Sequence, residues 1–240
     1  MNTSRSSKPI HTLQDNGVIL MLLSATCFST SIILIKVAGD NFAISFWVIT
    51  LCQFSLGLVM VKTFFRGKRK PVWKKTYTDP WLIARGVLGG IGIPLYNLCI
   101  LELGAGRSTI LNSSYPIFAA LLAPLLLAEH LKLRHIILGL IALGGICLMT
   151  GPESLKSGFN GYDLLAVSIA AVTGLIVVII RKLHATYNTA TIYASQCLVG
   201  FIICLPGALI DLSIPALSGW FFLIGSALCV ALGQITMTQG

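Results

Sequence analysis

The sequence predicts an all-α integral membrane protein, a helical bundle of about eight transmembrane helices. The first reason is composition: 55% of the residues are hydrophobic and only 10% are charged, whereas a soluble domain carries about 25% charged residues. The second reason is that the apolar residues occur in runs of about 20, the length that crosses a hydrocarbon core. Lipid offers no partner to unpaired backbone groups, and the runs are too continuous for barrel strands, so the spans must be helices.

The predicted spans follow one another with short polar links. A polar tail, residues 1–16, precedes the first span, which is retained because it is too long for a signal peptide and no small-residue cleavage site follows it. The predicted spans are, in order, Gly17–Ile35, Ala43–Phe65, Trp81–Leu101, Ser108–Ala128, His135–Thr150, Leu164–Ile180, Thr189–Ile210 and Leu217–Thr238.

The basic residues predict the orientation of the chain. If the N-terminus is cytoplasmic, 14 of the 17 lysines and arginines lie inside, and only Lys36, Arg107 and Lys156 lie outside. We therefore expect a multi-pass protein of the cell inner or plasma membrane. The basic loop Arg66–Lys75 sets the topology and is a candidate for contact with anionic lipid. The net charge of +9 is explained by these loops and does not indicate a nucleic-acid partner.

A weak internal repeat is visible. The first and sixth spans align at an offset of 145 residues and each ends in a basic residue, and Trp81 with Gly86 corresponds to Trp220 with Gly225. Five spans separate the two copies, so the second copy is inverted, as in secondary transporters, whose binding sites lie between the copies. The predicted division is a first repeat, 17–150, an outer linker, 151–162, and a partial second repeat of three helices, 163–240.

The fourth span has one polar face. Thr109, Asn112, Ser113 and Pro116 are spaced i, i+3, i+4 and i+7, which places them on the same side of a helix. This stripe either lines a substrate path or forms hydrogen bonds with a neighbouring helix, and the sequence leaves both readings open. Pro116 removes a backbone hydrogen bond and favours a kink over ligand coordination.

Further candidates for substrate contact are polar side chains within apolar spans, which are costly in lipid and are expected to face inward. They are Tyr96 and Asn97 in the third span, Gln196 in the seventh and Gln234 in the eighth. Gly86 and Gly90 form a small-xxx-small pair, which indicates close packing of the third span against another helix.

The charged residues near span ends are interpreted as interface groups. Glu102 and Arg107 are expected to pair across the turn between the third and fourth spans, and Glu129 is expected to anchor the inner interface. Lys36 and Arg85 are expected to extend toward the headgroups. Because no Asp or Glu lies in the middle of a span, any coupling role is assigned to an interfacial charge such as Glu102.

The sequence carries no pattern for cofactor or metal chemistry. The seven cysteines lie in apolar runs without a C-x-x-C spacing or a histidine cluster, so they are interpreted as small hydrophobic residues. There is no nucleophile–base pair and no pair of carboxylates within the spans, so we expect neither a metal site, nor a cofactor, nor an enzyme.

The fourth and fifth spans resemble a known family. Pro116, Glu129 thirteen residues later and Gly139 ten residues further resemble the signature of EamA-type members of the drug/metabolite transporter superfamily, and the likeness extends over residues 17–240. It implies ten helices in two inverted repeats of five, and export or import of small polar metabolites or drugs. By this resemblance helices nine and ten are missing, and Gln53 stands where an arginine is expected.

The leading interpretation is a multi-pass transporter of small polar metabolites or drugs that works by alternating access. The alternative is a non-transporting membrane fragment, or a chain that completes the bundle of a partner. The candidate polar groups are neutral amides and hydroxyls, which suit amino acids, sugars and amines alike, so the substrate stays open. The oligomeric state also stays open, with a homo-oligomer compatible with the sequence.

Overall fold

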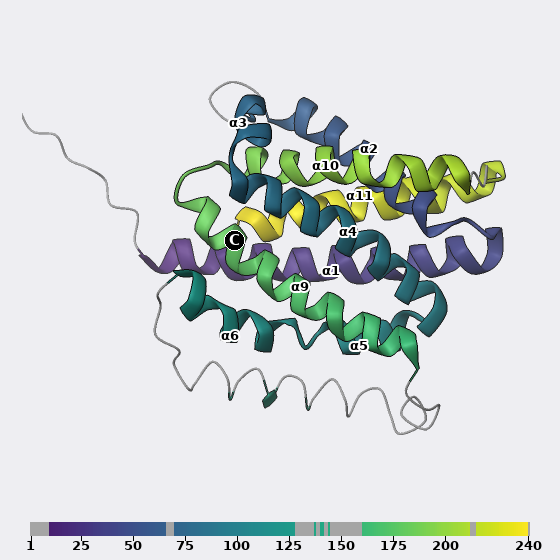
Figure 1. The fold of residues 1–240 in the computed structure, drawn as a ribbon, viewed down its shortest axis with the longest axis horizontal. Helices are drawn as coiled ribbons and strands as arrows, with labels where there is room; N and C mark the ends of the chain where they lie inside the picture. The colour runs from purple at the N-terminus through teal and green to yellow at the C-terminus, as the bar shows by residue number, and fades with distance from the viewer. Residues whose placement is uncertain are drawn as a thin grey trace, which may run out of the picture.

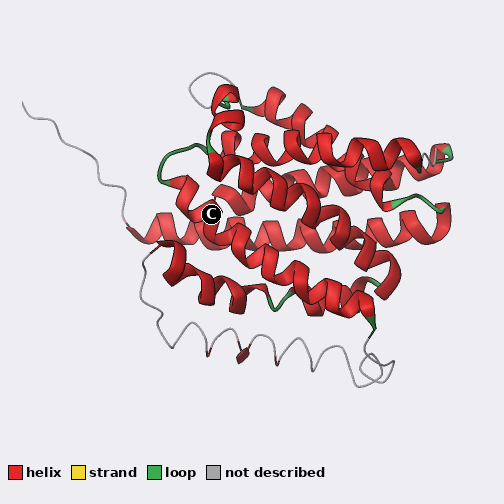
Figure 2. Cartoon of the chain, viewed as in Figure 1, coloured by secondary structure: helices red, strands yellow, loops and turns green. Residues whose placement is uncertain are grey.

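The computed structural model describes residues 10–65, 70–127, 160–211 and 215–239, together with Ile137, Leu140, Ile141 and Gly144. Within these residues all regular structure is helical (Figure 2). Seven described segments, six single helices and the helical segment Ala105–Leu126, are long and apolar enough to cross a membrane. The prediction of an all-α membrane bundle is confirmed, whereas most of the predicted fifth span, 135–150, lies outside the described residues.

Most of the long helices match or extend the predicted apolar spans, whereas the second, predicted at Ala43–Phe65, is shorter and covers Phe46–Phe64. The helix α9, for example, begins three residues earlier than predicted, because Asn160 and Asp163 form a capping box that satisfies its first backbone N–H groups. The long helices are α1 (Ile10–Phe42), α2 (Phe46–Phe64), α4 (Pro80–Leu103), α9 (Gly161–His184), α10 (Thr189–Ile210) and α11 (Leu217–Gln239).

The predicted fourth span is interrupted. It consists of α5 (Ala105–Asn112) and α6 (Tyr115–Leu127), with Ser113 and Ser114 in the turn between them. Pro116 is the second residue of α6, where its missing N–H costs no helical hydrogen bond. The predicted continuous span with a kink at Pro116 is therefore corrected: the helix breaks at Ser113 and Ser114, just before Pro116.

The helices pack in pairs that repeat across the bundle (Figure 1). The helix α1 packs mainly on α11, and α4 packs on α9; α2 contacts α11, and α10 contacts α4. The helices α2 and α10 also pack against each other. If α1, α2 and α4 are exchanged for α9, α10 and α11, each of these contacts maps onto another, so α2 and α10 occupy equivalent places at the centre.

The contact between α4 and α10 depends on glycines. A Cβ atom at Gly86 would lie 2.9 Å from the carbonyl oxygen of Ser195, and one at Gly90 would lie 2.9 Å from the Cα of Gly200. Both distances are shorter than ordinary contacts, and each involves backbone that cannot move aside. The small-xxx-small pair is therefore confirmed as a site of close helix packing.

Replacing Gly90 by alanine is expected to push α4 and α10 apart and to destabilise the protein by about 1–3 kcal/mol, the usual cost of overpacking. Gly92→Ala is the matched control, because a Cβ there would meet its nearest neighbour, Val172, at 3.6 Å. The control is expected to be neutral or to stabilise by about 0.5–1 kcal/mol, since alanine favours helix. Thermal unfolding of the two purified variants measures the difference, and equal stabilities would contradict this packing.

A short helix that the sequence analysis did not predict lies in the basic loop. This helix, α3 (Trp73–Thr78), is flanked by contacts to the turn before α10. The Asn188 amide donates to the carbonyl oxygen of Lys70 at 3.1 Å, and the backbone N–H of Val72 donates to the hydroxyl of Thr191 at 3.1 Å. These bonds attach the described part of the loop to α10.

Asp79 fixes the start of α4 beside this loop. Its carboxylate accepts from the backbone N–H of Trp81 at 2.8 Å and from the Tyr187 hydroxyl at 2.8 Å. Desolvation raises the pKa of Asp79, but the hydrogen bonds and nearby Lys75 outweigh it and hold that pKa below its ordinary value. The cap therefore stays ionised and positions the first turns of α4.

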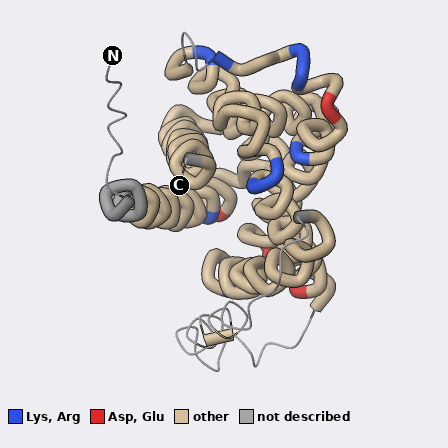
Figure 3. Tube along the Cα trace, turned by 90° about the vertical axis from the view of Figure 1, so that its left-hand side faces the viewer, with Lys and Arg blue, Asp and Glu red and all other residues tan. Residues whose placement is uncertain are grey.

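Basic residues gather at the end of the bundle that holds α3 (Figure 3). This end also carries the last turn of α9, where the Lys182 ammonium lies 3.7 Å from the centre of the Trp81 ring. The basic residues of the neighbouring segments are Lys62 in the last turn of α2, Lys70, Lys74 and Lys75 in or before α3, and Arg181 and Lys182 in the last turn of α9.

Candidate functional site

Arg85 lies inside the bundle. It is the sixth residue of α4, and only 2% of it is exposed. Its Nη2 donates to the side-chain oxygens of Gln196 on α10 and, at 3.4 Å, of Gln234 on α11. The prediction that Arg85 extends to the headgroups is wrong, because Gly89 leaves room for it: a Cβ there would lie 2.6 Å from the guanidinium.

A second polar group joins α2 and α4. The Asn97 amide donates to the hydroxyl of Thr50 at 2.8 Å and to the side-chain oxygen of Gln53 at 3.1 Å. The Thr50 hydroxyl in turn donates to the carbonyl oxygen of Phe46 at 2.6 Å, so it is free to accept from Asn97. All three polar side chains of this group are at most 2% exposed.

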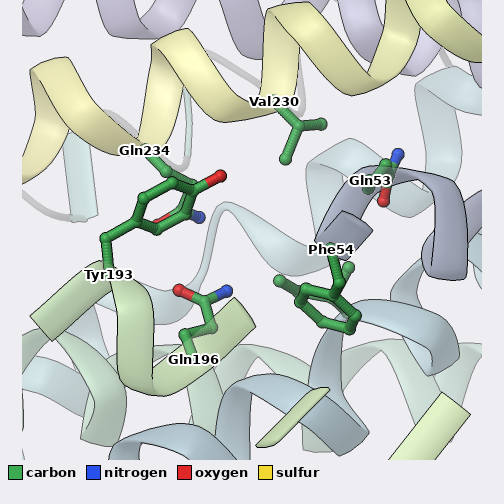
Figure 4. A pocket seen from close by; sticks show the side chains of 7 residues that line it. Gln53, Phe54, Tyr193, Gln196, Val230 and Gln234 are labelled. Carbon is green, nitrogen blue, oxygen red and sulfur yellow. The ribbon is translucent and has the colours of Figure 1, made fainter. Parts of the chain in front are cut away.

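A cavity lies between the two polar groups (Figure 4). Gln53 borders it from α2, whereas Gln196 and Gln234 border it from α10 and α11. The side chains leave only a narrow gap there, which has no room for a water molecule in this structure. The apolar and aromatic part of its wall is made by Phe54, Ile93, Tyr193 and Val230.

The polar residues around the cavity occupy equivalent positions in the helices. Gln53 and Gln196 are each the eighth residue, of α2 and α10 respectively. Asn97 and Gln234 are each the eighteenth residue, of α4 and α11. Gln53, Gln196 and Gln234 border the cavity, whereas Asn97 reaches it only through Gln53. Arg85 has no counterpart in α11, where the sixth residue is Phe222.

Buried polar atoms near the cavity include donors without a partner. Within the described residues, Nε2 of Gln53 and both Nε and Nη1 of Arg85 are buried and make no hydrogen bond. Each such unsatisfied donor costs about 1–3 kcal/mol, so these atoms need an acceptor that the described chain does not supply.

The predicted polar stripe lies elsewhere. The hydroxyls of Thr109 and Ser113 donate to backbone carbonyls of their own segment. Asn112 accepts from Thr173 of α9 at 3.4 Å, and Tyr96 interacts with both Thr109 and Asn112. None of these residues, nor Pro116, borders the cavity. Their contacts fit the interhelical reading of the stripe better than a substrate path.

The charged candidates lie away from the cavity. The Lys36 ammonium donates to the carbonyl oxygen of Leu101 at 2.8 Å and pairs with Asp40 at 2.9 Å. Glu102 is exposed. Glu129 lies outside the described residues, so its predicted interface role stays a prediction.

Arg107 pairs with a residue other than the expected one. Its guanidinium contacts both oxygens of Asp163, at 2.7 and 2.8 Å, so the predicted pair with Glu102 is wrong. Asp163 lies in the first turn of α9 and is 1% exposed. The helix N-terminus favours its negative charge, and the pair joins α5 to α9.

Three residues of the buried polar groups were not selected from the sequence as candidates: Arg85, Gln53 and Thr50. One feature of the sequence could have indicated that Arg85 is buried. The glycines at 86, 89 and 90 have no side chains, so neighbouring helices can approach closely and a long side chain can fit between them. Gln53 was noted only as a departure from the family pattern. Its position in α2, matching that of Gln196 in α10, becomes visible only when helix starts are known.

The fold and the buried polar groups define a multi-pass membrane protein with a polar interior shared by its central helices. A model of the EamA-like transporter family matches residues 15–151, more than half of the chain. The chain belongs to this family and is a membrane transporter.

Two relatives and one solved structure agree with this assignment. The pseudopaline exporter CntI of Pseudomonas aeruginosa (strain UCBPP-PA14) is 25% identical over 228 residues, which are 95% of this chain and 78% of the exporter. An uncharacterised transporter of Helicobacter pylori (strain J99) is 27% identical over 92% of this chain and 76% of its own length. A crystal structure with 16% identity superposes with a TM-score of 0.71 over 94% of this chain and 79% of that one, which shows a shared fold.

Proposed function

We propose that the protein moves small polar molecules across a membrane by alternating access, with the cavity between α2, α4, α10 and α11 as its substrate site. The observation that carries the proposal is the equivalence of Gln53 and Gln196, which face one cavity from α2 and α10. In secondary transporters built from inverted repeats, the substrate site lies between the repeats near the bilayer midplane.

The exchangeable helix pairs support this division into repeats. The helices α1, α2 and α4 belong to the proposed first repeat, and α9, α10 and α11 belong to the second. In an alternating-access cycle, these two sets rock against each other around the cavity. The gathering of basic residues at the α3 end supports placing that end, and the N-terminus, in the cytoplasm of an inner or plasma membrane.

The name of one relative suggests the direction of transport to test first. It is named as an exporter, so we propose export, with the cavity loading from the basic, cytoplasmic end. The same comparison does not carry over the relative's substrate.

Transport by vesicles tests the proposal. Inside-out membrane vesicles that contain the full chain are incubated with a labelled mixture of small metabolites, and accumulated molecules are identified by mass spectrometry against vesicles without the chain. Gln196→Ala is expected to reduce kcat/KM for any accumulated molecule about tenfold, the effect of losing one buried hydrogen bond. Asn112→Ala removes an amide outside the cavity and is expected to keep transport.

The outcomes separate the two sites considered above. Loss of transport in Asn112→Ala with wild-type rates in Gln196→Ala would move the substrate path to α5 and α9. Absence of accumulation of every molecule in the mixture, with the protein present and folded, would contradict transport by this chain.

A further inference from the structure

The unpartnered buried atoms of Gln53, which borders the cavity, and of Arg85, which contacts the bordering residues Gln196 and Gln234, are all hydrogen-bond donors. We propose that the transported molecule is a small carboxylate, whose anionic group binds on the side of the cavity where Arg85 lies. This inference rests on the proposed function and names the substrate class of the same site.

The charge of Arg85 is the first step of the argument. It is 2% exposed, and the ion pairs that the described residues form, Lys36 with Asp40 and Arg107 with Asp163, do not include it. The neutral oxygens of Gln196 and Gln234 compensate a buried cation only in part. An arriving carboxylate supplies the missing negative charge, whereas a cation adds repulsion.

The orientation of the amides is the second step. A glutamine has one acceptor and one donor branch, and Arg85 occupies the acceptor branches of Gln196 and Gln234. Their NH₂ groups are therefore the branches left for a ligand, on the side that carries the positive charge. Both side chains border the cavity, as Figure 4 shows.

The far side of the cavity is the third step of the argument. Gln53 has its oxygen bonded to Asn97 and its NH₂ without a partner in the described chain, so a ligand would need a neutral hydrogen-bond acceptor on that side. A molecule with a carboxylate at one end and a neutral polar group at the other meets both requirements.

Ligand-dependent unfolding tests this inference without transport. The full chain in detergent is heated with aliphatic and α-amino monocarboxylates of three to six carbons, each compared with its primary amide, and tryptophan fluorescence reports unfolding. At least one acid is expected to raise Tm while its amide does not. Equal protection by acids and amides, or no protection by any acid, would overturn the proposal.

Three variants assign the effect to Arg85. Arg85→Gln is expected to weaken binding of the protective acid at least tenfold. Lys74→Gln removes the same charge from the exposed helix α3 and is expected to leave the affinity unchanged. If Arg85→Gln does not fold, Arg85→Lys carries the test: it keeps the preference for acid over amide but loses about tenfold in affinity, because an ammonium lacks the planar fork of guanidinium donors.

The vesicle assay distinguishes failure of this inference from failure of the proposed function. Transport of a neutral or cationic molecule that depends on Gln196 but is unchanged in Arg85→Lys and Arg85→Gln would overturn the carboxylate assignment and leave the cavity as the transport site. Transport of a carboxylate that is unchanged in both Gln196→Ala and Arg85→Gln would reject the cavity itself.

Discussion

Asp163→Asn is expected to lower the free energy of unfolding by about 3–5 kcal/mol, the cost of removing one partner from a buried ion pair. The carboxylate is 1% exposed, and the Arg107 side chain is 18% exposed, so little water is present to replace the lost charge. Asparagine keeps an oxygen that can accept from the backbone N–H of Asn160, so the substitution isolates the charge from the capping box. Chemical or thermal unfolding of the purified variant measures the loss.

Asp40→Asn is the control for this prediction. It breaks the pair with Lys36, whose side chains are 29% and 53% exposed, and it is expected to cost at most about 0.5 kcal/mol. Equal losses of unfolding free energy in the two variants would show that Arg107 and Asp163 do not form a buried ion pair that stabilises the contact between α5 and α9.

The second large effect is that two matched substitutions are expected to change the free energy of unfolding in opposite directions. Gln196→Glu is expected to keep or raise the stability of the protein, because it gives Arg85 a carboxylate at the position of its present amide partner. Gln53→Glu makes the same isosteric change at the equivalent position of α2, where the bonded partner is the neutral amide of Asn97. A buried charge without a partner is expected to place Gln53→Glu at least about 3 kcal/mol below Gln196→Glu.

The same pair of variants bears on ligand binding. In Gln196→Glu the introduced carboxylate neutralises Arg85 and removes one NH₂ donor proposed for the ligand, so the protective acid is expected to lose its effect on Tm. Stability in the reverse order, with Gln53→Glu above Gln196→Glu, would mean that the positive charge of Arg85 does not dominate the field on its side of the cavity.

The membrane spans were predictable because each depends on a contiguous run of apolar residues. A distortion of the fourth span near Pro116 was predictable for a similar reason, whereas the break at Ser113 and Ser114 was not. The first residue of each helix could not be predicted from the apolar run alone. Caps such as Asn160 for α9 and Asp79 for α4 lie in polar links, and their role depends on backbone geometry.

The location of Arg85 could not be predicted for a different reason. Five residues from the start of α4, it is close enough to the interface for snorkelling to be the simplest reading. Its partners lie 111 and 149 residues away in the sequence, on α10 and α11. Burial of a long cation is decided by such long-range packing, and periodicity within one helix contains no information about it.

Arg107 illustrates the same limit. Sequence proximity favoured Glu102, five residues earlier, whereas the pair forms with Asp163, 56 residues later. The amides Gln196 and Gln234 were selected correctly as inward-facing side chains, and the structure brings them to one cavity. Asn97 reaches that cavity only through Gln53, and the stripe on α5 does not reach it.

The claim that the cavity binds substrate is tested most directly by protection of a cysteine placed in its wall. In a chain whose seven native cysteines are replaced by alanine, Val230→Cys introduces a thiol that borders the cavity, and Lys74→Cys introduces one on the exposed helix α3, outside the spans. A saturating concentration of the transported molecule is expected to slow maleimide labelling at position 230 and to leave the rate at 74 unchanged. Unchanged labelling at both positions under conditions of active transport would contradict the account.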